Sequence, residues 1–138
     1  MNRYCWEDIS IGMEEQFQVT VTEEMLSHFK DITGDVNPLH NEKEFAVQKG
    51  YPDRVSYGML TASFLSTLAG VYLPGEKSLI HSVESKFVKP VFLGDTLTIS
   101  GKVKDMDERF RYINLKVDIY NQKKEKVLRG SMQVGVID

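Results

Sequence analysis

Two residues that can carry protons lie close together in the first third of the sequence. Asp35 and His40 are five positions apart in the segment Thr33-Gly34-Asp35-Val36-Asn37-Pro38-Leu39-His40. Because Pro38 disfavours a helical conformation at Asn37, the segment is predicted to turn, and such a turn can direct both side chains into one cleft. A carboxylate and an imidazole around one water molecule form a general acid/base pair, and the imidazole titrates near neutral pH.

The same segment also has a purely structural interpretation. Asp-x-Asn-Pro is a self-capping turn, in which the side chains of Asp35 and Asn37 accept hydrogen bonds from neighbouring backbone N–H groups. The local sequence leaves both interpretations open.

A second candidate feature is the segment Ser56-Tyr57-Gly58-Met59-Leu60, which begins an apolar helix. The N-terminus of a helix presents unpaired N–H groups and the positive end of the helix dipole. Glycine has no side chain to block approach, so a carbonyl oxygen that gains negative charge could bind the Gly58 N–H. The alternative is that Gly58 only permits a tight entry into the helix.

Few other residues suggest reactive or metal-binding chemistry. Cys5 is the only cysteine, which excludes an intrachain disulfide and a cysteine-based metal site. No spacing of His, Asp and Glu matches a zinc or calcium site, and no phosphate loop or dinucleotide fingerprint occurs. His28 is interpreted as solvated and His81 as structural. We therefore expect no metal and no cofactor.

Composition and hydropathy limit the partners. The net charge of −3 argues against a generic nucleic-acid surface. The N-terminus lacks the apolar segment of a signal peptide, and the most apolar stretch, 59–73, is too short and too polar to span a membrane. A cytoplasmic protein is the default expectation, and an unpaired cysteine agrees with it.

Helix signals surround the Asp35–His40 turn. Residues 15–21 alternate weakly and predict a first strand. Thr22 is typical of a helix N-cap, and acidic residues in the following turn suit the helix dipole. Apolar residues at helical spacing then predict one buried face on a helix that ends at Gly34: Met25, Leu26, Phe29 and Ile32. A second, short helix is expected over 42–49.

Residues 58–73 predict a central helix. Their apolar side chains surround the helix axis and their polar side chains are small, which is typical of a helix buried on most sides. The sequence Pro74-Gly75 ends it.

The second half of the chain changes to a period of two, which is typical of strands with one buried face. Strands are expected over 96–103, 112–119 and 128–136, with a fourth over 83–91. The short turns between them predict an antiparallel sheet. One long helix and one such sheet predict an α+β fold in which the sheet wraps the helix, within a single domain over 1–138.

The chain length constrains any ligand site. A chain of 138 residues buries one core, but hardly a core and a deep pocket of its own. We therefore expect a site at the N-terminal end of the central helix, shared with a partner subunit. The expected assembly is a homodimer, or a larger oligomer built from it.

Taken together, these motifs resemble the MaoC-like hot-dog dehydratases, above all the (R)-specific enoyl-CoA hydratases. The most specific element is Asp-x-Asn-Pro-x-His, followed eighteen residues after the histidine by Gly-Met-Leu. The resemblance covers nearly the whole chain and also includes Phe29, Phe45-Ala46, Ala62-Ser63, Ser66, Leu73-Pro74-Gly75 and Phe87-x-x-Pro90-Val91-x-x-Gly94-Asp95. It implies the hot-dog fold, with an antiparallel β-sheet wrapped around a long central helix and a helical overhang segment that carries Asp35 and His40.

The resemblance also implies a reaction. Asp35 and His40 would activate water for addition at C3 of a trans-2-enoyl thioester, and one of them would deliver a proton at C2; the reverse reaction dehydrates an (R)-3-hydroxyacyl thioester. The Gly58 N–H would stabilise the thioester oxygen. No cofactor is needed, because the thioester itself acidifies C2. The implied substrate-binding residues are Asn37, which also shapes the loop, Tyr57, Met59 and Ser66, whose hydroxyl could instead bond back within its helix.

One position departs from the family pattern. The family usually has His-Gly-Met where this chain has Tyr57-Gly58-Met59. The backbone donor at Gly58 is retained, whereas Tyr57 can form hydrogen bonds but is not cationic at neutral pH. The change leaves the detail of the pocket and the preferred substrate open.

The acyl carrier is a second open point. The thioester is carried by CoA or by an acyl carrier protein, and six basic residues either meet these acidic carriers or form a solvated face: Lys86, Lys89, Lys102, Lys104, Arg109 and Arg111. Two other functions remain as alternatives, a hot-dog acyl-thioesterase and a non-catalytic acyl-thioester-binding subunit. His40 argues against the first, and the presence of both Asp35 and His40 argues against the second.

Overall fold

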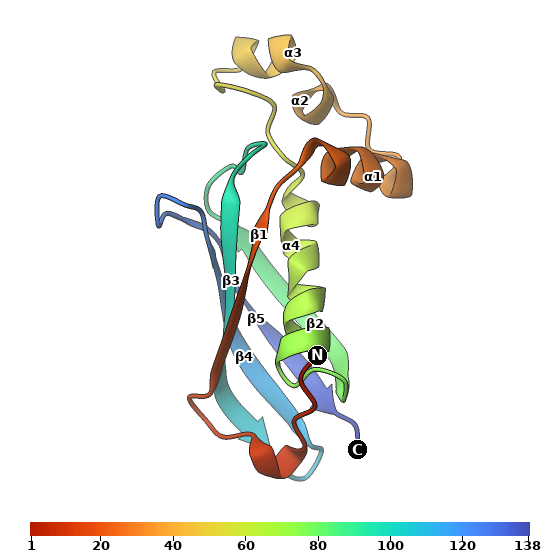
Figure 1. Cartoon of the computed structure of the whole chain (residues 1–138), viewed down its shortest axis with the longest axis vertical. Helices are drawn as coiled ribbons and strands as arrows, with labels where there is room; N and C mark the ends of the chain where they lie inside the picture. The colour runs from red at the N-terminus through yellow and green to blue at the C-terminus, as the bar shows by residue number, and fades with distance from the viewer.

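The computed structural model describes all 138 residues and contains one five-stranded antiparallel sheet (Figure 1). The strands lie in the order β1-β3-β4-β5-β2, so β1 and β2 form the two edges. Their bounds are β1 Glu14–Thr20, β2 Ser78–Phe87, β3 Thr96–Asp107, β4 Tyr112–Tyr120 and β5 Lys126–Val136. The alternation predicted for the last three strands is confirmed, since every second residue of β4 from Ile113 to Ile119 is buried.

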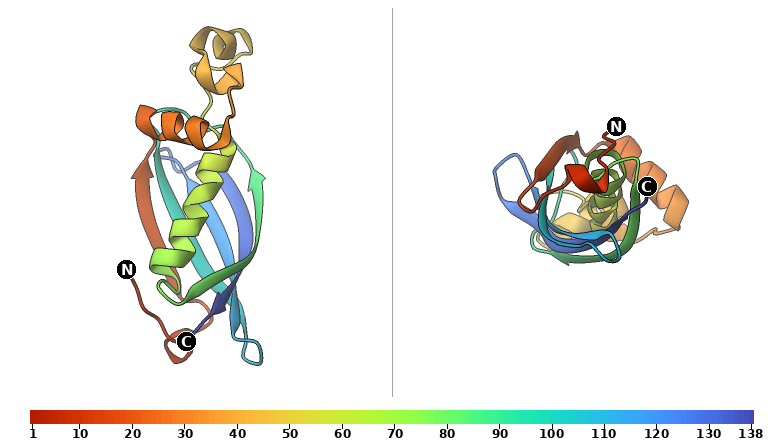
Figure 2. Two further views of the ribbon diagram at one scale, coloured as in Figure 1. Left: turned by 90° about the vertical axis from the view of Figure 1, so that its right-hand side faces the viewer. Right: turned by 90° about the horizontal axis from the view of Figure 1, so that it is seen from below.

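The sheet curls around one helix, α4, which spans Gly58–Thr67 and continues as a π-helical turn over Leu68–Tyr72. Seen along its axis, the helix lies inside the concave face of the sheet (Figure 2). Leu68 packs closely on β3, because a Cβ added to Gly101 would stand only 2.9 Å from a methyl carbon of Leu68. This arrangement confirms the predicted hot-dog fold.

Three short helices form the overhang at one end of the sheet: α1 Glu23–Thr33, α2 Pro38–Asn41 and α3 Lys43–Gln48 (Figure 1). The predicted N-cap of α1 is confirmed, since Thr22 Oγ1 accepts a hydrogen bond from the Met25 N–H at 3.2 Å. Gly34 ends α1 in the left-handed conformation with φ 72°, and its N–H bonds to the Lys30 carbonyl. An ion pair between Glu23 and Arg54 ties the start of α1 to the segment that enters α4.

The sequence predicts a turn around Pro38 and not helix α2, because proline disfavours a helical conformation at the residue before it. Proline is nevertheless favoured at the first helical position, where its missing N–H has no partner to lose. Asn37 caps the helix, since its Oδ1 accepts a hydrogen bond from the Leu39 N–H at 2.9 Å.

The predicted bounds of the fourth strand, which is β2, are wrong. It runs over Ser78–Phe87, whereas the pattern predicted 83–91. A register irregularity between Ile80 and Ser82 interrupts the alternation that would have revealed the first half of the strand.

Two expected apolar faces are less buried than predicted. The helical spacing predicts Ile32 on the apolar face of α1, but this residue is 82% exposed, because that end of α1 projects beyond the sheet (Figure 1). Helix α4 is buried towards the sheet, but Met59, Ser63 and Ser66 are exposed on its outer side. No helix in the structure combines the length and apolar character needed to cross a membrane.

Candidate active site

The loop after α1 holds the Asp35 carboxylate in a defined direction. The Asp35 N–H donates to Thr33 Oγ1 at 3.2 Å, and Asp35 Oδ1 accepts a hydrogen bond from the Asn37 N–H at 3.1 Å. The self-capping turn that the sequence allowed is therefore present. It occupies one carboxylate oxygen, and the second oxygen forms no hydrogen bond within the chain.

The imidazole of His40 is held from the opposite side. Its Nδ1 lies 2.6 Å from the carbonyl oxygen of Val55, while the Val55 N–H donates to the Leu39 carbonyl oxygen at 3.1 Å. A carbonyl oxygen only accepts hydrogen bonds, so the proton is assigned to Nδ1. In the neutral ring, Nε2 then carries the lone pair that can accept a proton.

Gly58 is the first residue of α4, and its N–H has no acceptor within the chain. The preceding residue, Tyr57, caps the helix without a side-chain hydrogen bond to it. A Cβ added to Gly58 would stand 3.2 Å from two carbons of the Phe87 ring. The absence of a side chain therefore lets strand β2 approach the helix terminus closely and leaves a backbone donor free.

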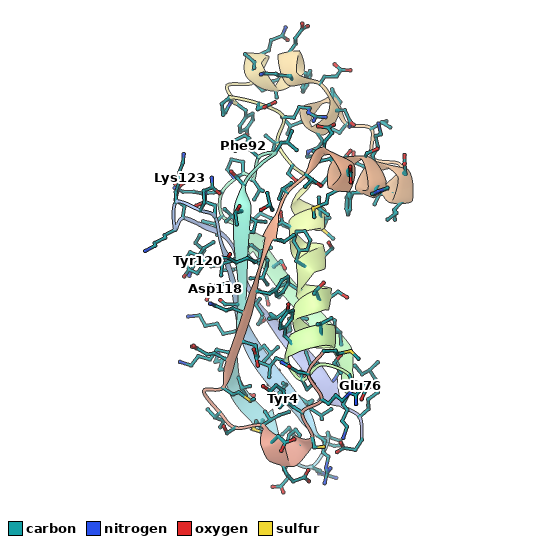
Figure 3. All side chains as sticks on the ribbon, viewed as in Figure 1. Tyr4, Glu76, Phe92, Asp118, Tyr120 and Lys123 are labelled. Atoms are coloured by element: carbon teal, nitrogen blue, oxygen red, sulfur yellow. The ribbon has the colours of Figure 1, made fainter.

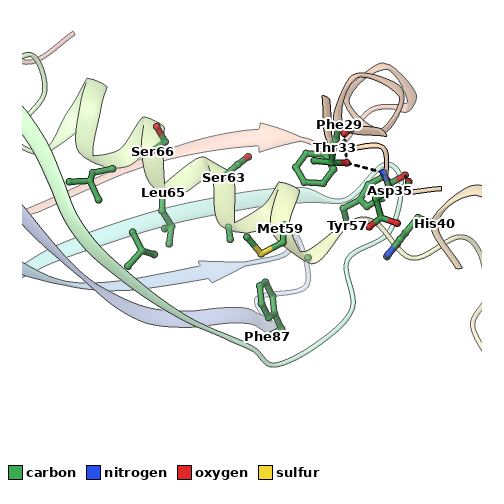
Figure 4. Close-up of a pocket in the computed structure, with 14 residues that line it drawn as sticks. Phe29, Thr33, Asp35, His40, Tyr57, Met59, Ser63, Leu65, Ser66 and Phe87 are labelled. Carbon is green, nitrogen blue, oxygen red and sulfur yellow. Dashed lines mark hydrogen bonds between the residues drawn. The ribbon is translucent and has the colours of Figure 1, made fainter. Parts of the chain in front are cut away.

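These groups meet at one end of a cavity of about 750 Å³ between the overhang, α4 and β2 (Figure 4). Asp35 and His40 line it from the overhang, and Gly58 lines it from α4. The volume lies in the range typical of small-molecule sites, which is roughly 300–1,000 Å³. Fourteen residues line the cavity: Phe29, Thr33, Asp35, His40, Tyr57, Gly58, Met59, Ala62, Ser63, Leu65, Ser66, Ile80, Val83 and Phe87.

Six of the seven residues predicted for the site line this cavity: Asp35, His40, Gly58, Tyr57, Met59 and Ser66. Asn37 does not, because its side chain caps α2. The hydroxyl of Ser66 forms no hydrogen bond within its helix, in contrast to Ser63, whose Oγ donates to the Leu60 carbonyl oxygen at 2.6 Å.

The sequence did not identify the wall that β2 contributes, which consists of Ile80, Val83 and Phe87. Strict alternation would place Ile80 and Val83 on opposite faces, and the register irregularity between Ile80 and Ser82 brings them to the same one. The wall is open in the single chain, where Phe87 is 53% exposed and Met59, opposite it on α4, is 65% exposed. The cavity is thus larger than the chain length suggested, but it is a groove rather than a closed pocket.

The arrangement suits chemistry on a polarised carbonyl compound. It combines a carboxylate oxygen, an imidazole nitrogen and a backbone N–H donor at one end of a largely apolar groove. No group of three or more His, Cys, Asp or Glu side chains is arranged to hold a metal ion.

Comparison with known proteins identifies the family. Residues 8–125 match the family described as "MaoC like domain". An (R)-specific enoyl-CoA hydratase of Rhodospirillum rubrum is 29% identical over 82% of this chain and 78% of its own. A 3-hydroxybutyryl-CoA dehydratase of Methylorubrum extorquens is 30% identical over 73% of this chain and 64% of its own.

A solved structure agrees with these sequence relatives. The (R)-hydratase from A. caviae involved in PHA biosynthesis superposes with a TM-score of 0.90 at 27% identity, covering 94% of this chain and 98% of that one. The family match extends from residue 8, through the Asp35–His40 turn and the central helix, to the turn between β4 and β5. The chain therefore belongs to the MaoC-like domain family.

Proposed function

We propose that this protein hydrates trans-2-enoyl thioesters to (R)-3-hydroxyacyl thioesters and catalyses the reverse dehydration. The observation that carries the proposal is that Asp35, His40 and the free N–H of Gly58 face one end of a single, largely apolar cavity. Named relatives of this chain are hydratases and dehydratases of this type, which are hydro-lyases.

In this proposal, the thioester oxygen accepts a hydrogen bond from the Gly58 N–H. As water adds to C3, negative charge moves onto that oxygen, and a donor at a helix N-terminus stabilises it. Asp35 and His40 hold the water molecule. One of them takes its proton as the oxygen–C3 bond forms, and one of them delivers a proton to C2, so that one water molecule is consumed for each double bond.

The hydrocarbon part of the acyl chain would occupy the apolar length of the groove. Met59 and Ser66 line the α4 side, and Val83 lines the β2 side. Leu65 is fully buried at the base of the groove, so side-chain size there limits the chain length that fits. A panel of enoyl-CoA substrates of increasing length would measure this limit.

We favour a CoA thioester, because the two relatives compared above are named for CoA substrates, and an acyl carrier protein is the alternative carrier. Half of the six basic residues considered for carrier binding already form ion pairs, namely Lys89, Lys102 and Arg111. The Lys89 ammonium, 2.5 Å from Glu125, also lowers the pKa of that carboxyl. Comparing the same enoyl chain on CoA and on a carrier protein would distinguish the two carriers.

We also propose that a second copy of the chain completes the groove. Strand β2 is an edge of the sheet, and its apolar side chains at Leu79, Val83 and Phe87 are exposed. Exposed apolar residues on an edge strand are typical of a surface that pairs with another chain. The exposed face of α4, beside this edge, would be covered in the same assembly.

The test is a spectroscopic assay with a short trans-2-enoyl-CoA, in which hydration removes the absorbance of the conjugated double bond. Chiral analysis of the product should give the (R)-3-hydroxyacyl thioester. Release of free thiol without hydration would instead indicate a thioesterase. Saturable binding without turnover at any chain length would indicate a non-catalytic acyl-binding subunit.

A further inference from the structure

Tyr57 occupies the junction between α4 and the overhang, and its side chain is almost completely buried, at 2% exposure. Its hydroxyl donates a hydrogen bond to the carbonyl oxygen of Asp35 at 2.7 Å. The same hydroxyl lies 3.2 Å from Asn41 Nδ2, which donates to it, and this amide also donates to the Asn37 carbonyl oxygen at 2.8 Å. One phenol thus connects the catalytic turn to α2.

The ring of Tyr57 lies between aromatic groups from two overhang helices. Its centroid is 4.3 Å from that of His40 on α2 and 4.9 Å from that of Phe29 on α1, with interplanar angles of 32° and 44°. Aromatic pairs at these separations stabilise one another beyond the burial of their area. The single side chain therefore contacts α1, the turn at Asp35 and α2.

The hydroxyl of Tyr57 is committed to these contacts. A phenolic oxygen donates one hydrogen bond, and here that bond goes to a backbone carbonyl of the catalytic turn. The ring of Tyr57 lines the cavity, but its hydroxyl forms hydrogen bonds only with residues of the overhang. This geometry favours a different role from the substrate contact that the resemblance implied.

We propose that Tyr57 is a positioning residue, which sets Asp35 and His40 relative to the Gly58 N–H. This inference rests on the proposed hydratase function. Tyr57 immediately precedes Gly58, so the residue that leads into the oxyanion donor also holds the acid/base pair, through the Asp35 main chain and the His40 ring. Water addition requires the Asp35 carboxylate, the His40 imidazole and the Gly58 N–H at defined distances from one another, because small errors of position lower the rate strongly.

The first experiment compares Tyr57→Phe with Tyr4→Phe in steady-state hydration. Both changes remove a phenolic hydroxyl that donates a hydrogen bond at 2.7 Å, but Tyr4 bonds to Glu15 at the end of the sheet far from the overhang (Figure 3). For Tyr57→Phe we expect kcat to fall by about 10- to 100-fold with KM changed less than about threefold. Tyr4→Phe should retain the parent values.

The second experiment tests whether the network acts as a unit. Asn41→Ala removes the amide that donates to the Tyr57 hydroxyl and should also lower kcat. In the double variant with Tyr57→Phe, the losses should be less than multiplicative, since both changes break one network. Fully multiplicative losses would contradict the proposed linkage.

The third readout does not depend on activity. The NMR chemical shifts of the His40 ring should change in Tyr57→Phe but not in Tyr4→Phe, because loss of the hydrogen bond to the Asp35 carbonyl lets the aromatic ring that packs against the imidazole move.

Three outcomes would overturn the inference: an unchanged kcat in Tyr57→Phe, a rise in KM alone, or unaltered chemical shifts of the His40 ring. An inactive parent protein would contradict the proposed function instead. If Tyr57→Phe does not fold, an unchanged kcat and unchanged chemical shifts of the His40 ring in Asn41→Ala would contradict the inference.

Discussion

The ring of Phe87 lies across the N-terminus of α4, so that a Cβ placed on Gly58 would stand 3.2 Å from its Cδ1 and Cε1. The edge strand and the central helix therefore meet at the backbone donor that the proposed mechanism uses. Phe87 also lines a second, smaller cavity of about 280 Å³ that shares His40 and Gly58 with the main groove. A small change at this contact should alter the reaction without disturbing the rest of the fold.

Gly58→Ala should lower kcat/KM by about tenfold, because the methyl group displaces Phe87 and shifts the N–H away from the thioester oxygen. The helix itself should tolerate alanine, which has a higher helix propensity than glycine. Steady-state kinetics with a short enoyl-CoA and a thermal melt would separate the two effects. Adding Phe87→Leu should recover part of the rate; parent-like kinetics in Gly58→Ala alone would argue against a role for this contact.

Asp35→Asn and His40→Ala should each lower kcat by about 10²- to 10⁴-fold, since in the proposed mechanism each group takes part in proton transfer. Asparagine retains an oxygen for the Asn37 N–H, so the turn should persist in Asp35→Asn. Matched controls are Asp31→Asn and His28→Ala, which change exposed residues of α1. Hydration that survives both active-site changes would refute the assigned roles.

Leu79→Glu should shift the proposed dimer towards monomer and lower the specific activity of the protein. Leu79 is 53% exposed on the edge strand β2 and does not line the main cavity, so the charge should act on chain pairing. Sedimentation velocity across a range of concentrations would measure the shift. Phe110→Glu, in the turn after β3, is the matched control. A parent protein that is monomeric and fully active would contradict the shared-groove proposal.

Thr61→Val should raise the free energy of unfolding by about 1 kcal/mol. Thr61 is 2% exposed, and its Oγ1 forms no hydrogen bond, so the hydroxyl loses hydration without gaining a partner. Valine has nearly the same shape and no polar atom to bury. Urea denaturation of the two proteins would measure the difference, and a destabilised Thr61→Val would indicate that the hydroxyl is hydrogen-bonded to water in solution.

Much of the fold followed from the sequence alone, because its determinants are local. The period of two in β3, β4 and β5 reflects one buried face of a sheet, and it can be read without knowing which strands pair. The caps of α1 at Thr22 and Gly34 depend on residues within one or two helical turns. The Asp35–His40 turn and Gly58 were likewise visible as candidates from residue type and spacing.

The remaining features depend on contacts between distant segments. The bulge in β2 hid the first half of that strand, which includes Ile80 of the cavity wall, and the four residues of α2 are too few to show a period. The Tyr57 hydroxyl meets the Asp35 carbonyl across 22 residues. Only the tertiary structure shows that the Tyr57 hydroxyl binds the overhang. The direction of this side chain is set by the helices that pack around it, and not by the residues next to Tyr57 in the sequence.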